Sequence, residues 1–297
     1  MVIRTVLLAV VGLGAGALAA PAPVAALQGG DTPRFETTAV AEGVYRFRWQ
    51  AHVAFFVVGE RAVAAFDPLN PEAAAVYARE IRRVTDRPVR WIVYSHSDAD
   101  HASGAAVLAE GTGGGAEIVA TRAAVDDIMR RASPDQPPPT VTFERTLSLD
   151  LGGRTVELHY LGPNHSDNSL VALVPDARVA FAVDFVNADR VGFRDLPGWH
   201  FPGQTVSIRR MLGLDFDTVV FGHGPVGDRA AVFRQLEYWD ALERAVRDAV
   251  RAGWTEDEAA ARIRLERFAD WGGYEDWFEL NVRGAYRIIA GAEGGGR

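Results

Sequence analysis

The feature that most constrains this chain is a run of potential metal ligands directly after an apolar segment. Residues 94–101 read Tyr-Ser-His-Ser-Asp-Ala-Asp-His and place four donor side chains within six positions, those of His96, Asp98, Asp100 and His101. The apolar segment 89–94 predicts a strand that ends in a loop. Alternate residues of an extended loop can face the same side, so these donors can converge. A polar helix start, capped by the same residues, is the alternative interpretation.

Three further donor side chains follow strand-like segments later in the chain. They are His165 in Gly-Pro-Asn-His, Asp184 in Ala-Val-Asp-Phe and His223 in Phe-Gly-His-Gly. The chain contains no cysteine, so every metal ligand must be a nitrogen or oxygen donor. Histidine and carboxylate suit zinc, iron or manganese. Seven ligands are enough for two ions, and water bound to such ions loses a proton near neutral pH.

Length and charge limit the class of protein and the partners. The chain has 297 residues, of which 48% are hydrophobic and 24% charged, which predicts a globular protein with a substantial core. The formal net charge is −8, and no run of basic residues forms a stripe. An acidic surface repels phosphate backbones, so we expect a small-molecule substrate and no nucleic acid. No motif indicates an oligomeric state.

The N-terminus predicts export. A short basic head ending at Arg4 precedes an uncharged run, Thr5 to Ala20, followed by small-residue cleavage sites up to Ala26. We therefore assign residues 1–26 to a signal peptide and expect the protein in the periplasm or outside the cell. The run is shorter than the ~20 residues of a spanning helix, so we expect no stable membrane insertion after cleavage.

The remaining chain predicts an α/β domain at residues 35–227 and a helical C-terminal extension at 228–290 packed on it. Strands followed by a ligand-bearing loop occur twice. The expected strands are 44–48, 52–58, 61–66, 89–94, 117–120, 141–149, 154–161, 169–174 and 179–183. The expected helices are 71–84, 102–108, 122–131, 232–250, one from Thr255 and 274–290.

Five motifs in order resemble those of the metallo-β-lactamase fold superfamily. They are Asp67 after a strand, the His96 cluster, Gly162-x-x-His165, Val183-Asp184 and Gly222-His223-Gly224. The resemblance covers roughly residues 40–225. It implies a four-layer αββα sandwich with ions at the sheet edge.

The resemblance also implies a ligand set and a chemistry. His96, Asp98 and His165 would hold a first ion, Asp100, His101 and His223 a second, and Asp184 would bridge them. Two divalent ions, preferably zinc, would hold a hydroxide that attacks an ester, lactone, thioester, β-lactam or phosphodiester-type bond. Asp100 and Asp184 are thus the expected catalytic residues, with Asp100 orienting the hydroxide.

Asp98 departs from the family pattern, because most members carry histidine at this place. With Asp98 as a third carboxylate, the net charge of a site that holds two divalent ions and a hydroxide would be close to zero. A less positive site favours harder ions, so iron or manganese are alternatives to zinc. A di-iron flavoprotein branch of the family carries glutamate here, but its flavodoxin domain has no counterpart in this chain. Aspartate is one methylene shorter and could miss the ion.

Two alternative functions follow from the same ligands. The first is an iron-dependent oxidoreductase or oxygenase on the same fold, and the second is a non-catalytic metal-binding accessory protein. A β-lactamase is disfavoured because one subclass requires a cysteine ligand and another usually lacks the bridging aspartate.

Other residues are candidates for supporting roles. Asp67 is expected to support the site without contacting an ion, by a hydrogen bond to a ligand histidine or to the backbone. Four residues are candidates for the substrate pocket, namely His52, Trp199, His200 and Trp277, although ordinary surface or core packing would also explain them.

Overall fold

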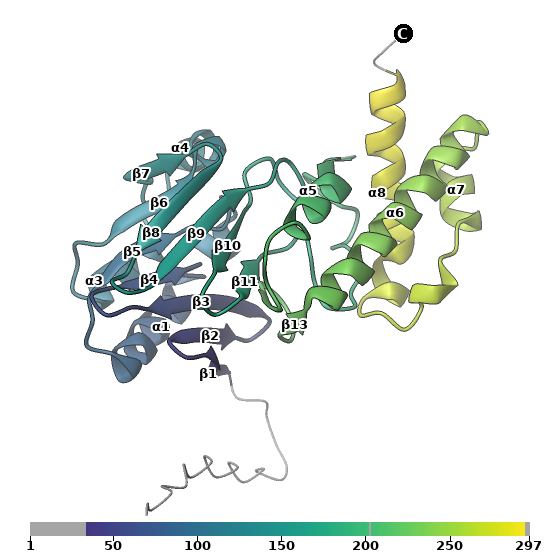
Figure 1. The fold of residues 1–297 in the computed structure, drawn as a ribbon. Helices are drawn as coiled ribbons and strands as arrows, with labels where there is room; N and C mark the ends of the chain where they lie inside the picture. The colour runs from purple at the N-terminus through teal and green to yellow at the C-terminus, as the bar shows by residue number, and fades with distance from the viewer. Residues whose placement is uncertain (1–33, 202, 295–297) are drawn as a thin grey trace, which may run out of the picture. The chain divides into compact units, whose positions relative to one another are not determined.

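The computed structural model describes residues 34–201 and 203–294, which lie within one compact unit. Two β-sheets pack face to face, and helices cover the outer face of each (Figure 1). This arrangement is the predicted αββα sandwich. The predicted signal peptide, residues 1–26, lies outside the described residues and stays a prediction.

The first sheet contains seven strands in sequential order, β1-β2-β3-β4-β5-β6-β7. The bounds are β1 Phe35–Ala41, β2 Val44–Trp49, β3 His52–Val58, β4 Val63–Phe66, β5 Val89–Val93, β6 Glu117–Thr121 and β7 Val141–Phe143. Strands β1 to β4 pair antiparallel, whereas β4 to β7 pair parallel. Both faces of the parallel part are covered, which accounts for the fully apolar sequence of β4.

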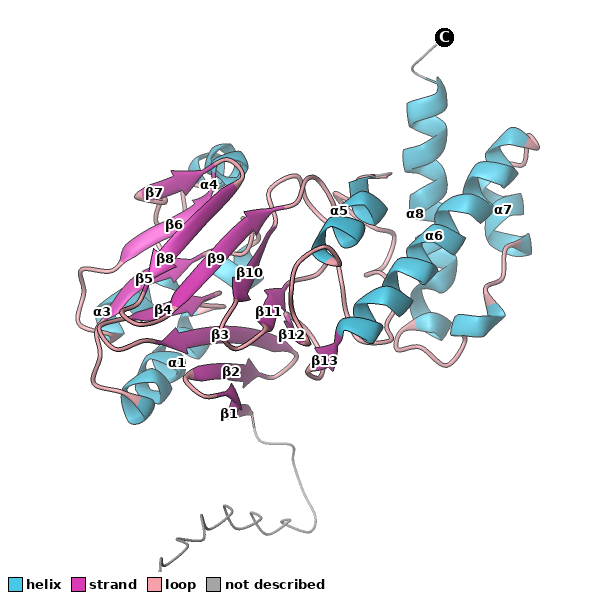
Figure 2. Ribbon diagram, in the orientation of Figure 1, coloured by secondary structure: helices cyan, strands magenta, loops and turns pink. Residues whose placement is uncertain are grey.

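The second sheet contains six strands in the order β13-β12-β11-β10-β9-β8. The bounds are β8 Thr146–Asp150, β9 Thr155–Tyr160, β10 Leu170–Val174, β11 Val179–Ala182, β12 Thr218–Phe221 and β13 Gly227–Asp228. Strands β11 and β12 are parallel, so their carboxyl ends reach the same edge. Figure 2 shows the strands of both sheets set beside the helical C-terminal region.

Helices lie outside both sheets, and the last α-helix packs against the two α-helices that precede it. The α-helices are α1 Pro71–Val84, α2 Ala99–Ala102, α3 Ala105–Gly111, α4 Val125–Arg131, α5 Gly203–Met211, α6 Arg229–Arg251, α7 Glu256–Arg262 and α8 Tyr274–Gly294; the 3₁₀ helices are η1 Arg122–Ala124 and η2 Glu266–Phe268. Helix α1 begins where Asn70 accepts a hydrogen bond from the Ala73 N–H and Pro71 occupies the first turn. Helix α7 begins with the predicted capping box of Thr255 and Glu258.

Three hydrophobic clusters fill the spaces between the layers. One lies between the sheets, where the Phe55 and Phe181 rings stack with centroids 5.1 Å apart. A second joins the first sheet to α1 and α3. The third joins the second sheet to α5, α6, α7 and α8. Because one cluster continues from the sheet into the C-terminal helices, these helices are part of the same packed body.

The structure differs from the sequence-based prediction at several places. Residues 141–149 form two strands, β7 and β8, which belong to different sheets, because the chain crosses between layers at Glu144 and Arg145. The helix expected at 102–108 divides into α2 and α3 at Gly104, where an added Cβ would lie 2.4 Å from the Pro68 carbonyl oxygen. Strand β1, helix α5 and strand β13 were not predicted, whereas β12 corresponds to the strand-like segment expected before His223.

No helix among the described residues has both the length and the apolar character needed to cross a membrane.

Candidate metal centre

The predicted donors lie where strands end at one edge of the sandwich. Asp67 follows β4, the segment 95–101 follows β5, Asp184 follows β11 and His223 follows β12. Strands β4 and β5 are parallel, as are β11 and β12, so the carboxyl ends of each pair meet at the same edge. Local sequence therefore supplies the donors, and strand pairing brings them together.

The first donor group consists of His96, Asp98 and His165. One donor atom from each lies within 4.8 Å of the other two. The Asp98 Oδ2 atom is 3.6 Å from His96 Nε2 and 3.4 Å from His165 Nε2. The shorter aspartate side chain therefore reaches both imidazoles, as the ligand assignment requires.

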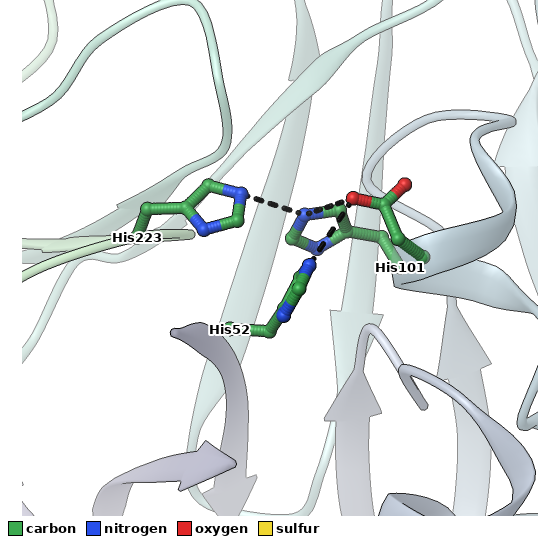
Figure 3. Close-up of side chains that lie close together, drawn as sticks. His52, His101 and His223 are labelled. Atoms are coloured by element: carbon green, nitrogen blue, oxygen red, sulfur yellow. Dashed lines mark hydrogen bonds and ion pairs between the residues drawn. The ribbon is translucent and has the colours of Figure 1, made fainter. Parts of the chain in front are cut away.

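The second donor group consists of His52, Asp100, His101 and His223, again with one donor atom from each within 4.8 Å of the others. Figure 3 shows the three imidazoles turned toward one another. The Nε2 atoms of His101 and His223 are 3.3 Å apart, and His101 Nε2 is 3.7 Å from Asp100 Oδ2. Three of these residues were predicted as ligands, whereas His52 was predicted only as a pocket residue.

Asp184 lies between the two groups and presents one oxygen to each. Its Oδ1 atom is 2.9 Å from His223 Nε2, and its Oδ2 atom is 3.2 Å from His96 Nε2. Its backbone adopts a left-handed conformation, with φ of 66°, which aspartate tolerates better than bulky residues. Burial opposes ionisation, but the neighbouring imidazoles of His101 and His223 hold the pKa of Asp184 well below its usual range.

Asp67 is fully buried and orients a histidine from each group. It accepts hydrogen bonds from the Ser95 N–H at 2.8 Å, the Ser95 hydroxyl at 2.8 Å and His101 Nδ1 at 3.0 Å. Since the Ser95 hydroxyl proton points to Asp67, its oxygen accepts from His96 Nδ1, 2.8 Å away. Both histidines are thereby set with the Nε2 lone pair facing the centre.

The donor atoms fit cations better than they fit one another. The Nδ1 atom of His223 donates to the Ala51 carbonyl oxygen at 2.9 Å, and that of His101 donates to Asp67. The Nε2 atoms of the two histidines are 3.3 Å apart, and with Nδ1 as the donor each can present its Nε2 lone pair to a cation. In the first group, the buried Nε2 atom of His96 has no hydrogen-bond partner among the described residues. A divalent ion at each group would satisfy these nitrogens.

The carboxylates of the two groups are held ionised. The neighbouring imidazoles, that of His165 first and that of His96 second, hold the pKa of Asp98 well below its usual range. Burial raises the pKa of Asp100, but the hydrogen bond with His52 and the charge of His101 outweigh burial and lower it to about 2. Both side chains are therefore anionic at neutral pH, as metal ligands must be.

Two cavities open onto the centre. The larger, of about 510 Å³, is lined by Ala51, His52, Asp98, Asp100, His165, Asp184, Asn187, Arg190, Val191, Phe193, Pro197, Trp199, His223 and Trp277. The smaller, of about 330 Å³, is lined by Ser97, Asp98, Asp127, His165, Ser166, Asp167, Asn168, Pro197, Gly198 and His200. Of the four residues predicted for the pocket, three line the larger cavity, and His200 lines the smaller one.

Two residues beside the predicted pocket residue Trp277, namely Arg190 and Phe193, were not predicted from the sequence. The Arg190 guanidinium lies over the Trp277 ring at 4.8 Å, and the backbone at Arg190 pairs with Gly272. Phe193 packs edge-on against Trp277 with ring centroids 5.1 Å apart. These contacts join the loop after Asp184 to the start of α8, and no local pattern reveals such a pairing.

Comparison with known proteins identifies the family. The model of the metallo-beta-lactamase superfamily matches residues 47–223, which include all seven predicted metal ligands. The chain belongs to the metallo-β-lactamase superfamily. Solved structures with this fold include a metallo-beta-lactamase from Pontibacter korlensis, with a TM-score of 0.61 and 18% identity over 68% of this chain and 97% of that one. The TMB-1 structure gives a TM-score of 0.60 and 17% identity over 69% of this chain and 96% of that one.

One curated family relative has a different activity in its name. The 2,4-dinitroanisole O-demethylase subunit alpha of Nocardioides sp. (strain JS1661) is 30% identical over 234 residues. The match covers 78% of this chain and 65% of that protein, so this chain spans about two thirds of its relative's length. The two solved structures are under 20% identical and therefore support the fold alone.

Replacing Asp98 by alanine tests whether this unusual family member uses Asp98 as a ligand. We expect Asp98→Ala to bind one ion fewer per chain, or to bind the first ion about 10- to 100-fold more weakly, since two imidazoles would remain in that group. Metal analysis after gel filtration measures the ratio. Asp127→Ala, which changes an aspartate that lines only the smaller cavity, is the control. An unchanged ratio in Asp98→Ala would remove Asp98 from the ligand set.

Proposed function

We propose that the protein is a metal-dependent hydrolase of small, largely apolar substrates. The observation that supports this most strongly is the position of Asp184, whose two oxygens face the two donor groups beside a cavity of about 510 Å³. When bound, two divalent ions would supply Lewis acidity and a water that is deprotonated near neutral pH. Zinc is the preferred pair of ions, with iron or manganese as alternatives because of the carboxylate of Asp98.

The residues around the ions would bind and orient the reactants. His96, Asp98 and His165 would hold the first ion, while Asp100, His101 and His223 would hold the second. Asp184 would contact both. Asp100 has Oδ2 directed at His52 and His101, so its other oxygen is available to accept a proton or a hydrogen bond from the reacting water.

The larger cavity supports an apolar or aromatic substrate. Trp199, Trp277, Phe193 and Val191 provide apolar surface, and the charged residues are concentrated at the metal centre and at Arg190. An apolar group on these rings would place a polar, reactive bond near the donor groups. Lipophilic esters, lactones, thioesters and β-lactams have this form.

Replacing Trp277 by alanine tests the role of the aromatic wall. We expect Trp277→Ala to raise KM for aromatic or long-chain substrates about tenfold while changing kcat less, because apolar contact area is lost away from the reacting bond. Steady-state kinetics with matched short and long substrates measure the effect. Trp254→Ala, which changes a tryptophan that pairs with Arg262 and does not line the cavity, is the control. An unchanged KM for every substrate would contradict this role.

A substrate screen tests the proposed hydrolysis directly. The purified protein would be analysed for metals and assayed at several pH values with lactones, thioesters, β-lactams and phosphodiesters. We expect turnover that is lost on chelation and restored by zinc, iron or manganese. A full metal complement without turnover on any substrate would instead support an accessory metal-binding protein.

An aryl methyl ether is a second candidate substrate, because the O-demethylase subunit shares 30% identity with this chain. Nitro groups withdraw electrons from the ring and make the carbon that carries the methoxy group electrophilic. Addition of hydroxide at that carbon and departure of methoxide, with one proton supplied, would convert the ether and water into a phenol and methanol. This reaction is a hydrolysis and needs no oxidant.

Product analysis separates this reaction from oxidative demethylation, which belongs to the iron-dependent alternative. Oxidative removal of the methyl group would release formaldehyde and consume oxygen and two electrons. We therefore propose 2,4-dinitroanisole as an assay substrate, with methanol, formaldehyde and oxygen uptake measured together. Methanol without oxygen uptake would support hydrolysis, whereas formaldehyde with oxygen uptake would support the oxidative alternative.

We also propose export to the periplasm or the cell exterior, on the basis of residues 1–26. Mass spectrometry of the protein from cell fractions would test it. A mature chain that begins after Ala19 or Ala26 in the exported fraction is the expected result, and full-length protein in the cytoplasm would contradict it.

A further inference from the structure

His52 stands at a position from which it can reach the second donor group. It is the first residue of β3, and its backbone forms an isolated bridge with His223. The Val53 N–H donates to the Gly222 carbonyl oxygen at 2.8 Å, and His223 Nδ1 donates to Ala51 at 2.9 Å. The same short segment therefore fixes the backbone of His223 and directs the His52 side chain toward it (Figure 3).

The four donor atoms are close enough together to bind a single tetrahedral ion. Zinc–nitrogen and zinc–oxygen bonds of about 2.0–2.1 Å place neighbouring tetrahedral ligands about 3.3–3.4 Å apart. His52 Nε2 lies 3.3 Å from Asp100 Oδ2, and His101 Nε2 lies 3.3 Å from His223 Nε2. The distance from His101 Nε2 to Asp100 Oδ2 is 3.7 Å. Two of the six ligand–ligand distances of such a site thus have the expected value, and a third is about 0.3 to 0.4 Å longer.

We propose that His52 is a fourth protein ligand of the second ion, in addition to the three residues expected there. The second site would then be built from three histidines and one aspartate, with Asp184 facing it as well. The first group has three donors besides Asp184, so open coordination positions for water and substrate would be concentrated at the first ion. This inference rests on the proposed metal centre but not on the identity of the substrate.

The competing explanation is that His52 only donates a hydrogen bond to Asp100. Two variants separate the roles. His52→Ala removes both the ligand and the hydrogen bond, whereas His52→Gln keeps an N–H that can reach Asp100 but is a poor metal ligand. His159→Ala is the matched control, because that imidazole pairs with Glu157 on β9 and lines neither cavity.

The experiment is a titration of the metal-free proteins with cobalt(II), followed by calorimetry and by the visible absorption of the bound ion, which reports its ligand number. We expect both His52 variants to bind the second ion at least about tenfold more weakly than the wild type, with an altered absorption band and unchanged binding of the first ion. The His159 control should match the wild type. Thermal unfolding of the metal-free variants checks that they fold, and the part-exposed position of His52 favours this.

Several results would overturn the proposal. Wild-type binding of the second ion in either variant would show that His52 is not a ligand. A wild-type protein that takes up only one ion at saturation would also remove the site. Uptake of two ions with the expected loss in the variants, but without hydrolysis of any substrate, would support the ligand assignment and contradict the proposed function.

Discussion

Asp184→Asn is expected to bind both ions more weakly and to lose more than a hundredfold in kcat/KM. The carboxylate has one oxygen 2.9 Å from His223 Nε2 and the other 3.2 Å from His96 Nε2, so a single substitution removes a negative charge from both donor groups. A loss of at least about 3 kcal/mol of transition-state stabilisation corresponds to this factor. Asparagine has the same size and tolerates a positive φ, so the fold should persist.

The measurements are metal content after dialysis, circular dichroism and steady-state kinetics. Asp189→Asn is a suitable control, because Asp189 also has a positive φ, of 46°, but its carboxylate is paired with Arg234 at the surface. We expect the control to keep two ions and full activity. Retention of two tightly bound ions in Asp184→Asn would show that this residue does not bridge the centre.

Asp67→Asn is expected to lower the free energy of unfolding by about 2–4 kcal/mol and to weaken the binding of both ions about 10- to 100-fold. Asp67 is fully buried and accepts three hydrogen bonds through its two oxygens. An asparagine side chain can accept hydrogen bonds only at its single oxygen. The amide N–H would therefore face the donors of Ser95 or His101, and the tautomers that direct the lone pairs inward would be lost. Chemical denaturation and metal titration measure the two effects.

Ser95→Ala is the matched variant for this prediction. It removes only the hydroxyl that connects His96 to Asp67 and leaves the direct bond from His101 to Asp67 in place. We therefore expect Ser95→Ala to weaken binding of the first ion and to leave binding of the second ion unchanged. If Asp67→Asn leaves both ion affinities unchanged, or if Ser95→Ala weakens the second ion instead, the orienting role is wrong.

The sequence predicts those parts of the site that local chain order determines. His96 and Asp184 lie within three residues of apolar strands, and His101 belongs to the same ligand-rich segment as His96, so their places at one edge of the sheets could be derived from the pattern. The reach of Asp98 depends on a separation of a few ångströms between loops. The sequence left that separation open, and the structure brings Asp98 Oδ2 to 3.4 Å from His165 Nε2.

Features that depend on pairing between distant segments could not be predicted in the same way. His52 is near His223 only because the start of β3 pairs with the loop after β12. Arg190 is near Trp277 because its backbone pairs with Gly272. The apolar alternation through 141–149 continues across the crossing between sheets, so a local pattern cannot show where one strand ends and another begins.

The two donor groups draw their side chains from both halves of the sandwich. Each combines residues that follow or begin strands of the first sheet with a histidine from the second, His165 in one group and His223 in the other. Ions bound there would link the two layers. The free energy of unfolding would therefore rise with the concentration of free metal. Without bound metal, the contact between the layers would lose the free energy that ion binding contributes, and the buried cluster between the sheets would remain.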